Sequence, residues 1–484
     1  MPHIRIFRHY VHTPLILLAA GELVIIAACF YLGHYTRFGD LEAVPPHLIG
    51  ALTFAFTNVA CMVAMGVYES RIREGMTGML LRTAVAIFLL GAAAMAILIY
   101  VFPVLDIGRG VLLVASVEAF AAVTIFRWIV FVFVDEERFK TRVLVLGTGH
   151  RAVKIASRMR RRTDQRAFKL AGFLEPGNAT VASPDSASVN GSHAISAYAA
   201  TIIQTDLPLP EYCEHNGIEE IVVAMDERRR NVDAVGGLPL EELLECRLRG
   251  IRVCDVQQFI EREAGKLDVD LLRPSWMVFS DGFIVGSWRE FSKRLFDVLA
   301  SSLLLLVAWP FMLVTILCIW LEDGFRSPIF YRQTRIGLDG KPFDVIKFRS
   351  MRVDAEKAGE AVWATRNDAR ITRVGAFIRK SRIDELPQLF NVLRGNMSFV
   401  GPRPERPIFV EELNQKIPFY NERHRIKPGI TGWAQLCYPY GASVEDAKEK
   451  LQYDLYYLKN NSLLLDLVIL LQTVEVVLVG DGAR

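Results

Sequence analysis

The sequence predicts a membrane protein of the α plus α/β class, with a bundle of four transmembrane helices followed by two α/β domains. First, the 484-residue chain is 52% hydrophobic and its mean hydropathy is +0.26, which is high for a soluble protein. Second, four apolar stretches of about 20 residues, the length of a membrane-spanning helix, lie within the first 134 residues. Third, the remaining chain alternates short apolar runs, glycine turns and helical patterns, and its length suits about two further domains.

The first domain is predicted to cover residues 1–138. Its apolar segments are residues 15–32, 48–68, 83–102 and 111–134. The first segment contains Glu22 and lacks a small-residue cleavage site, so we expect a membrane anchor rather than a cleaved signal peptide. Glu22 and Glu118 lie inside these segments and are either a functional pair or polar contacts that hold helices together.

The charges that flank these segments predict the orientation. Cations cluster before the first segment, between the second and third, and after the fourth: Arg5, Arg8, Arg71, Arg73, Arg82, Arg138, Lys140 and Arg142. The other two loops contain only Arg37 and Arg109. The positive-inside rule then puts the N-terminus and everything after residue 134 in the cytoplasm, so we expect a multi-pass membrane protein. None of the seven cysteines forms a C-x-x-C pair, which fits a reducing compartment.

The second domain, residues 139–285, is predicted to be Rossmann-like. An apolar run from Arg142 leads into Gly147-x-Gly149-x-x-Ala152, the pattern of a buried strand, a glycine turn and a helix, and Glu175 ends the next strand at 169–174. Further strands are expected at 218–224 and 250–256, with a helix between them at Leu240–Leu248. The glycine turn is either a nucleotide-phosphate site or simply a tight turn.

The third domain, residues 286–484, begins with a second membrane element. An apolar run from 295 to 321 is interrupted by Asp297 and Pro310. We expect a re-entrant helix over about 291–321 that breaks at Pro310, because residues 324–428 contain 21 lysines and arginines against 12 acidic residues, and a spanning helix would export this +9 block. The alternative is a kinked fifth spanning helix. The apolar run at 463–479 is expected to be an interfacial or domain-packed helix rather than a spanning one.

Two adjacent carboxylates, Asp384 and Glu385, lie among arginines in this basic block. Asp384 is predicted to be the N-cap of a helix that ends at Gly395, where the helix dipole would favour its ionised form. An ionised aspartate can bind Mg²⁺ or attack phosphorus. The alternative is that Asp384 is only a cap.

An ordered set of motifs surrounds this pair, at residues 331–343, 344–351, 372–375, 379–388, 400–404 and 427–435. The set resembles the bacterial sugar transferases, the monotopic phosphoglycosyl transferases, from about residue 291 to the C-terminus. Four spanning helices and a Rossmann-like domain before it are similar to the large polyprenyl glycosylphosphotransferase branch. Residues 403–407 and 440–447 resemble members associated with exopolysaccharide and exosortase (PEP-CTERM) loci.

The resemblance implies transfer of a sugar 1-phosphate from a UDP-sugar to undecaprenyl phosphate, with release of UMP and use of Mg²⁺, as the priming step of exopolysaccharide synthesis. It implies that Asp384 is the nucleophile of a covalent phosphosugar intermediate and a metal ligand, and that Glu385 supports metal and proton handling. Phosphate-binding candidates in matching motifs are Lys347, Arg349, Arg379 and Arg403. The family often has Ser-Pro at the re-entrant break, where this chain has Trp309-Pro310.

Two other functions compete with this interpretation of the sequence. An NAD-dependent dehydratase or epimerase would need a Tyr-x-x-x-Lys base, and no tyrosine has a lysine four residues later. A non-catalytic membrane regulator or nucleotide-sensing scaffold would use the basic domain to bind anionic lipid. Expected partners are therefore UDP-sugar, undecaprenyl phosphate and inner-membrane lipids, with a homodimer left open and no nucleic acid. The sequence does not identify the sugar or the ligand of the middle domain.

Overall fold

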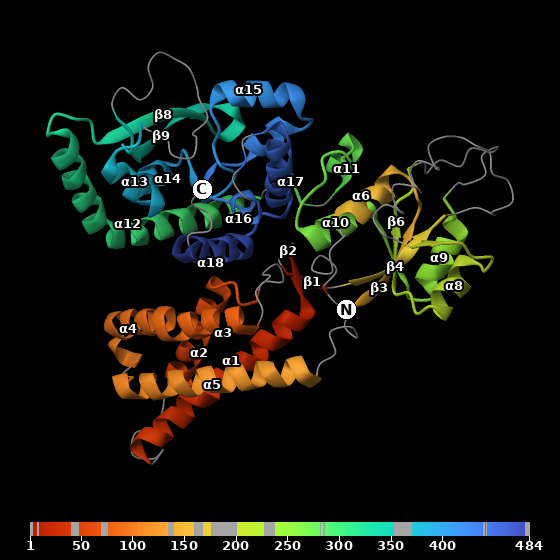
Figure 1. The fold of residues 1–484 in the computed structure, drawn as a ribbon, viewed down its shortest axis with the longest axis horizontal. Helices are drawn as coiled ribbons and strands as arrows, with labels where there is room; N and C mark the ends of the chain where they lie inside the picture. Colours follow the sequence, from red (N-terminus) through yellow and green to blue (C-terminus); the bar gives the residue numbers. More distant parts are fainter. Residues whose placement is uncertain are drawn as a thin grey trace. The chain divides into compact units, whose positions relative to one another are not determined.

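Figure 1 draws the computed structural model of the chain. It describes residues 3–6, 9–39, 48–68, 76–105, 107–133, 140–158, 168–175, 201–226, 238–280, 282–283, 286–352, 370–438, 441 and 443–479. Arg8, Arg71, Arg73 and Arg138, four of the cations that predict the orientation, lie outside these ranges, as do parts of the motif at 440–447. The chain forms two compact units, one built mainly from residues up to Leu271 and one mainly from Leu272 to Arg484.

The first unit begins with the paired short strands β1 (His3–Ile6) and β2 (His9–His12), followed by apolar helices. These are α1 (Thr13–Phe38), α2 (Leu48–Ala64), α3 (Met76–Ala84), a π-helix (Val85–Gly91), α4 (Ala92–Val101) and α5 (Arg109–Phe133). Thr13–Phe38, Gly78–Val101 and Arg109–Val130 are long and apolar enough to span a membrane, whereas Leu48–Ala64 is shorter. All four predicted apolar segments are therefore helical.

A buried ion pair joins these helices. Arg127 on α5 donates to Glu22 on α1 (Nη2–Oε2, 2.7 Å) and to Thr83 (Nη1–Oγ1, 2.6 Å), and the Tyr68 hydroxyl also donates to Glu22. Glu22 is fully buried. Glu118 instead accepts from Thr36 of α1 at 3.1 Å. Because the two glutamates have different partners and each links two helices, the contacts fit helix packing rather than a functional pair.

A five-stranded parallel sheet follows in the same unit. Its strands are β3 (Thr141–Leu146), β4 (Phe168–Leu174), β5 (Ile202–Ile203), β6 (Glu220–Val223) and β7 (Arg252–Asp255), in the order β5-β4-β3-β6-β7. The sequence predicted four of these strands and the helix α9 (Leu240–Leu248).

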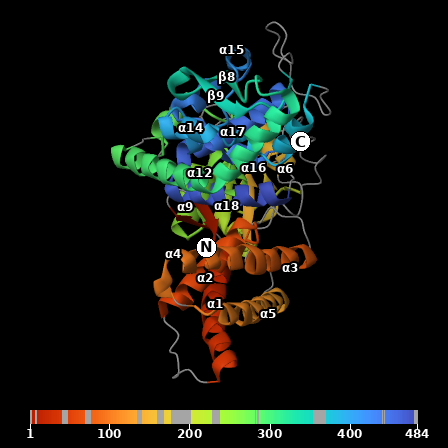
Figure 2. The ribbon, with the colours of Figure 1, turned by 90° about the vertical axis from the view of Figure 1, so that its left-hand side faces the viewer.

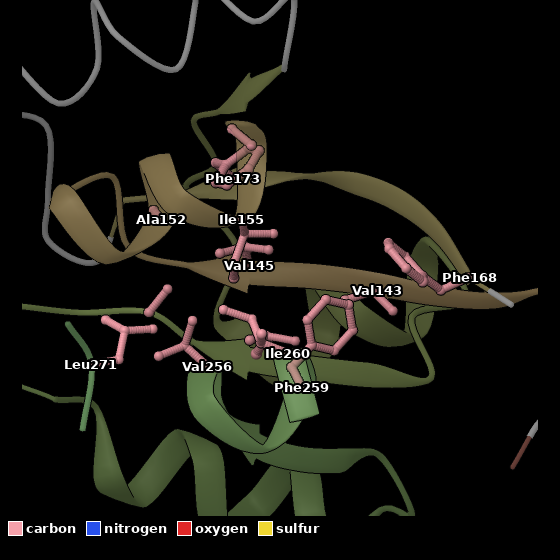
Figure 3. Packing of buried hydrophobic residues seen from close by; sticks show 13 residues of the cluster. Val143, Val145, Ala152, Ile155, Phe168, Phe173, Val256, Phe259, Ile260 and Leu271 are labelled. Carbon is pink, nitrogen blue, oxygen red and sulfur yellow. The ribbon is translucent and has the colours of Figure 1, made fainter. Parts of the chain in front are cut away.

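Helices cover both faces of this sheet. Successive side chains of β3 point to opposite faces, so Val143 and Val145 belong to one core and Leu144 and Leu146 to the other. Figure 3 shows the first core, where Val145 meets side chains from α6 (His150–Arg158) and α10 (Val256–Ala264). On the other face lie α8 (Leu209–His215) and α9. A strand buried on both faces explains the continuous apolar run that predicted β3.

The second unit contains the motif-rich region. Its helices are α11 (Pro274–Phe279), α12 (Ser287–Asp323), α13 (Arg373–Lys380), α14 (Gln388–Arg394), α15 (Pro407–Lys416), α16 (Trp433–Cys437), α17 (Val444–Asn460) and α18 (Leu463–Val479). Antiparallel strands β8 (Phe330–Ile336) and β9 (Pro342–Phe348) form a hairpin, with Asp339 left-handed in its turn (φ 55°). Short strands β10 (Ser398–Val400) and β11 (Gly429–Thr431) pair in parallel.

Helix α12 contacts the rest of its unit at both ends. Near its start, Arg294 donates to the carbonyls of Val392 and Leu393 at the end of α14 (2.6 and 2.7 Å). At its end, Glu322 accepts from the amides of Arg373 and Val374, which begin α13. A straight helix of 37 residues would be about 55 Å long.

The helix therefore changes direction, and Figure 1 shows a sharp turn partway along α12. The helical assignment continues through Pro310, so the chain bends without the helix ending there. Figures 1 and 2 show α18 beside α12, where Lys293 pairs with Asp466 at 2.8 Å.

Candidate active site

Asp384 and Glu385 lie in a 3₁₀ turn, Ile383–Glu385, between α13 and α14. The prediction that Asp384 caps the following helix is wrong. Pro387 occupies the N-cap position of α14, and no side chain caps that helix. The predicted end at Gly395 is confirmed, because Gly395 is left-handed with φ 88°.

Arg382 causes this difference. It adopts the left-handed conformation (φ 58°), which is uncommon for a residue with a side chain. The chain leaves α13 through this reversal and enters a separate turn before α14 begins, so the dyad precedes α14 instead of capping it. Strained backbone of this kind is frequent at functional sites.

Glu385 is buried among cations. Its Oε1 lies 3.2 Å from Lys347 Nζ, 3.1 Å from Arg403 Nη2 and 3.8 Å from Arg382 Nη1. Burial alone would raise the pKa of Glu385, but Arg403, Lys347 and Arg382 lower it well below its usual range. Glu385 is therefore ionised at neutral pH. Its carboxylate holds together two segments that are distant in the sequence, β9 and the loop after β10.

Asp384 has a contrasting environment. It is only 9% exposed, and no hydrogen bond to its carboxylate is found within the described part of the chain. Burial and the neighbouring charge of Glu385 raise its pKa, while Lys347, Arg379 and Arg382 act in the opposite direction. The expectation that the helix end would favour ionisation of Asp384 is thus wrong in sign. A buried carboxylate without donors keeps its lone pairs available for another group.

The loop that carries Arg403 depends on three close backbone approaches. A Cβ on Gly401 would lie 2.4 Å from the Lys427 carbonyl, one on Gly429 would lie 2.1 Å from the Gly401 amide, and one on Gly432 would lie 2.2 Å from the Gly401 carbonyl. Only glycine fits at such crossings. The glycines of these two motifs therefore let the backbones around β10 and β11 approach closely. This close approach fixes the start of the loop before Arg403.

The structure brings three of the four predicted phosphate-binding cations to the dyad. Lys347 and Arg403 contact Glu385, and Arg379 lies near enough to Asp384 to influence its pKa. No described contact joins Arg349 to the dyad. Its side chain is 6% exposed and pairs with Asp323 at the end of α12 (2.6 Å), with Nε and Nη1 buried and without a partner among the described residues. Arg349 therefore links the end of α12 to the end of β9 through its ion pair with Asp323, and we call this link a clasp.

The residues present fit a magnesium ion held chiefly by substrate. Within the described residues, no group of three or more His, Cys, Asp or Glu side chains forms a metal cage. Asp384 is the carboxylate without a cationic hydrogen-bond partner, whereas Glu385 contacts Lys347 and Arg403. Mg²⁺ in phosphate-transfer sites is commonly bound by one or two carboxylates together with substrate phosphates and water, and Asp384 suits that arrangement.

The glycine turn of the parallel sheet already holds a carboxylate. Asp226 accepts hydrogen bonds from the amides of His150 (2.6 Å) and Arg151 (3.1 Å) at the start of α6. A Cβ on Gly149 would lie 2.2 Å from Asp226 Oδ2, so this glycine makes room for the chain's own side chain. Asp226 thus occupies the place where a nucleotide phosphate would bind a helix N-terminus.

Sequence reasoning missed several residues of this site. Arg382 was adjacent to the dyad and could have been chosen by its charge, but nothing in the sequence indicates a left-handed conformation. Arg423 and Asp454 form a buried pair near Arg403 at 2.8 Å. Since 31 residues separate them, only the fold reveals the contact.

Comparison with known proteins gives a consistent result. A family model described as bacterial sugar transferase matches residues 288–480. A UDP-glucose:undecaprenyl-phosphate glucose-1-phosphate transferase of Caulobacter vibrioides is 39% identical over 238 residues, covering 48% of this chain and 88% of that protein.

Two longer relatives also match. The UDP-N-acetylgalactosamine-undecaprenyl-phosphate N-acetylgalactosaminephosphotransferase of Aeromonas hydrophila is 41% identical over 242 residues, 50% of this chain and 56% of that protein. The undecaprenyl-phosphate glucose phosphotransferase of Komagataeibacter xylinus is 32% identical over 353 residues, 70% and 59% respectively. This chain therefore spans little more than half the length of these two relatives.

Proposed function

Because the chain belongs to the bacterial sugar transferase family, we propose that it transfers a sugar 1-phosphate from a UDP-sugar to undecaprenyl phosphate and releases UMP. The observation that carries the proposal is the division of roles within the dyad. Glu385 is held by Lys347 and Arg403, while Asp384 has no hydrogen-bond donor among the described residues. One carboxylate organises cations and the other is left to react.

The reaction proceeds in two displacements. A carboxylate oxygen of Asp384 attacks the phosphorus attached to the sugar, the bond from that phosphorus to the bridging oxygen breaks, and UMP leaves with the electron pair. A phosphate oxygen of undecaprenyl phosphate then attacks the same phosphorus, and the Asp384 carboxylate is released. The product is undecaprenyl diphosphate sugar, and the kinetics are ping-pong.

The cations offset the repulsion between these anions. Lys347 and Arg403, which both contact Glu385, bind oxygens of the transferring phosphoryl group, and the charges of Arg379 and Arg382 act on Asp384 as well. When bound, Mg²⁺ neutralises charge on the diphosphate. Glu385 acts mainly by orienting Lys347 and Arg403, since both of these side chains meet its Oε1.

Helix α12 is proposed to be the re-entrant anchor. Support comes from its apolar length and from the two groups of contacts that tie its start to α14 and its end to α13, both in the same unit. A helix that entered and crossed the bilayer would part these ends. We propose that the second unit lies on the cytoplasmic side of the inner membrane, where a UDP-sugar is available. Labelling of a cysteine placed after Leu321 from the periplasmic side alone would contradict this.

The parallel sheet is proposed to be a Rossmann-like domain, which its strand order supports. We propose that it does not bind a nucleotide phosphate at Gly147–Gly149 in this state, because Asp226 fills the turn. We also propose a role in exopolysaccharide priming, with an association with exosortase loci, on the motif resemblance at residues 403–407 and 440–447.

The test is to incubate membranes containing the protein with undecaprenyl phosphate, Mg²⁺ and a panel of UDP-sugars, and to measure UMP release and lipid-linked product. We expect UMP release with at least one UDP-sugar and a sugar-labelled protein when the lipid phosphate is omitted. Release of UMP without any protein-bound sugar would retain the transfer and exclude the covalent step. No release with any sugar would favour the non-catalytic alternative.

A further inference from the structure

We infer that Arg423 is a positioning residue for the proposed transfer, because it binds the backbone carbonyl of Arg403 and so fixes the cation that contacts Glu385. This inference rests on the proposed function. Arg423 lies in the 3₁₀ segment Tyr420–Arg425, away from the motifs that hold the dyad. Its Nη2 donates to the Arg403 carbonyl at 3.0 Å.

The guanidinium of Arg423 uses all three of its nitrogens. Nη2 and Nε contact the Asp454 carboxylate at 2.8 and 3.1 Å, and Nη1 donates to the Tyr420 hydroxyl at 2.8 Å. Arg423 and Asp454 are 6% and 2% exposed. Burial raises the pKa of Asp454, although the charge of Arg423 counteracts it. Such a pair is rigid because neither charge can turn to water, and a lysine at this position would supply a single point of contact.

The neighbouring carbonyls of the loop are fixed as well. The Val400 carbonyl accepts from Lys293 Nζ and the Tyr457 hydroxyl, both at 3.1 Å, and the Pro402 carbonyl accepts from the Gly429 amide at 2.9 Å. The Glu405 carbonyl accepts from the Ile336 amide at 2.9 Å. Arg423 supplies the contact at Arg403 itself, where the backbone leads directly into the catalytic cation.

This arrangement predicts an effect on geometry rather than on charge. The Arg403 side chain reaches Glu385 at 3.1 Å and is 35% exposed, so its aim depends on the backbone that carries it as well as on its side-chain contacts. A displacement of about 1 Å at a reacting group can lower the rate about 100-fold. Fixing the Arg403 carbonyl is therefore a means of aiming the Arg403 side chain at Glu385.

The experiment is a double-mutant cycle in the full-length protein, with sugar transfer to undecaprenyl phosphate as the readout. Arg423→Lys is expected to lower kcat by about 10- to 100-fold. In an Arg403→Ala background the same change should cause almost no further loss, because its effect acts through Arg403. Additive losses would overturn the inference. Arg425→Lys is the matched control: Arg425 lies in the same segment but is exposed, and its variant should retain wild-type activity.

A second measurement separates folding and function. Thermal unfolding shows whether Arg423→Lys folds. Asp454→Asn provides a second way to weaken the Arg423–Asp454 pair that holds the Arg403 carbonyl. Hydrogen exchange of residues 400–405 needs no substrate: we expect faster exchange in Arg423→Lys and Asp454→Asn than in the wild type or Arg425→Lys. Unchanged exchange would overturn the inference even if transfer is observed. Faster exchange in a protein that transfers no sugar would instead reject the proposed function alone.

Discussion

Two aspartates in this chain, Asp226 shortly after β6 and Asp384 in the turn before α14, have opposite environments. Asp226 accepts two backbone amides at the start of α6, so the glycine turn that resembles a phosphate site is satisfied by the protein itself. Asp384 is buried, has a raised pKa and has no described hydrogen-bond donor. The difference teaches that the proposed site for phosphate chemistry is the one where a buried carboxylate lacks a donor among the described residues, even though the glycine motif is the more familiar signal.

The largest effect is expected at the reactive member of this comparison. Asp384→Asn keeps the shape but removes the nucleophilic carboxylate, so transfer should fall by about 10³-fold or more. Covalent labelling by a radioactive UDP-sugar should disappear. Asp339→Asn in the β8–β9 turn, where asparagine tolerates the left-handed conformation, should behave like the wild type. Persistent labelling of Asp384→Asn would place the nucleophile elsewhere.

The next effect concerns the neighbour that raises the pKa of Asp384. Glu385→Gln should lower kcat/KM by about 100-fold, since Lys347 and Arg403 lose the charge that orients them. It should also shift the pH profile. In the wild type, activity should fall on acidification as Asp384 is protonated, because burial and the charge of Glu385 raise the pKa of Asp384.

Without the Glu385 charge, the pKa of Asp384 falls, so the acid limb of kcat/KM should move to lower pH. Burial already lowers the pKa of Lys347 and Glu385 opposes this, so the alkaline limb should move in the same direction. Glu422→Gln, on an exposed pair with Arg425, should leave both limbs in place. An unshifted acid limb would show that Asp384 does not govern the profile.

A third prediction tests whether Arg349 belongs to the dyad or to the membrane helix. If it is a clasp, Arg349→Met and Asp323→Asn should each lower the free energy of unfolding by about 3 kcal/mol, and the double variant should lose little more. Denaturant unfolding in detergent measures this. A large loss of kcat in Arg349→Met with unchanged stability would instead restore its predicted place among the phosphate-binding residues.

The smallest effect is expected at the satisfied aspartate. Asp226→Ala removes a carboxylate that caps α6 and should lower stability by about 1 kcal/mol, with transfer unchanged. Asp226→Asn, which keeps an acceptor oxygen, should lose less. The opposite result would be an Asp226→Ala variant with wild-type stability that no longer transfers sugar. Asp226 would then serve the reaction.

Sequence patterns predict correctly those helices and strands whose local residue pattern is characteristic of one type of element. The run from Arg142 to Leu146 alternates between two cores and was read as a buried strand, and Leu240–Leu248 was predicted with its observed bounds. The N-cap at Asp384 was wrong because Arg382 takes a left-handed conformation that has no sequence signature. Motifs in the sequence predict Lys347, Arg403 and Glu385 as site residues, but only the fold shows that both cations contact Glu385.

Arg349 illustrates the remaining difficulty. A buried clasp and a phosphate ligand both use arginine, and they differ only in which acidic partner the fold supplies. Here that partner is Asp323 at the end of α12, and strands β8 and β9 separate it from Arg349 in the sequence. The bend in α12 is a similar case, because Pro310 predicts a change of direction but does not reveal that helical structure continues through it.

The crossing of Gly401, Gly429 and Gly432 has a consequence for protein engineering. Each backbone leaves no room for a side chain on the other, so the loop after β10 and the segment around β11 form a single exchangeable module. Chimaeras that borrow one of these segments from a relative must borrow both, together with their mutual spacing. A library that varies either segment alone would sample mostly collisions and few new specificities.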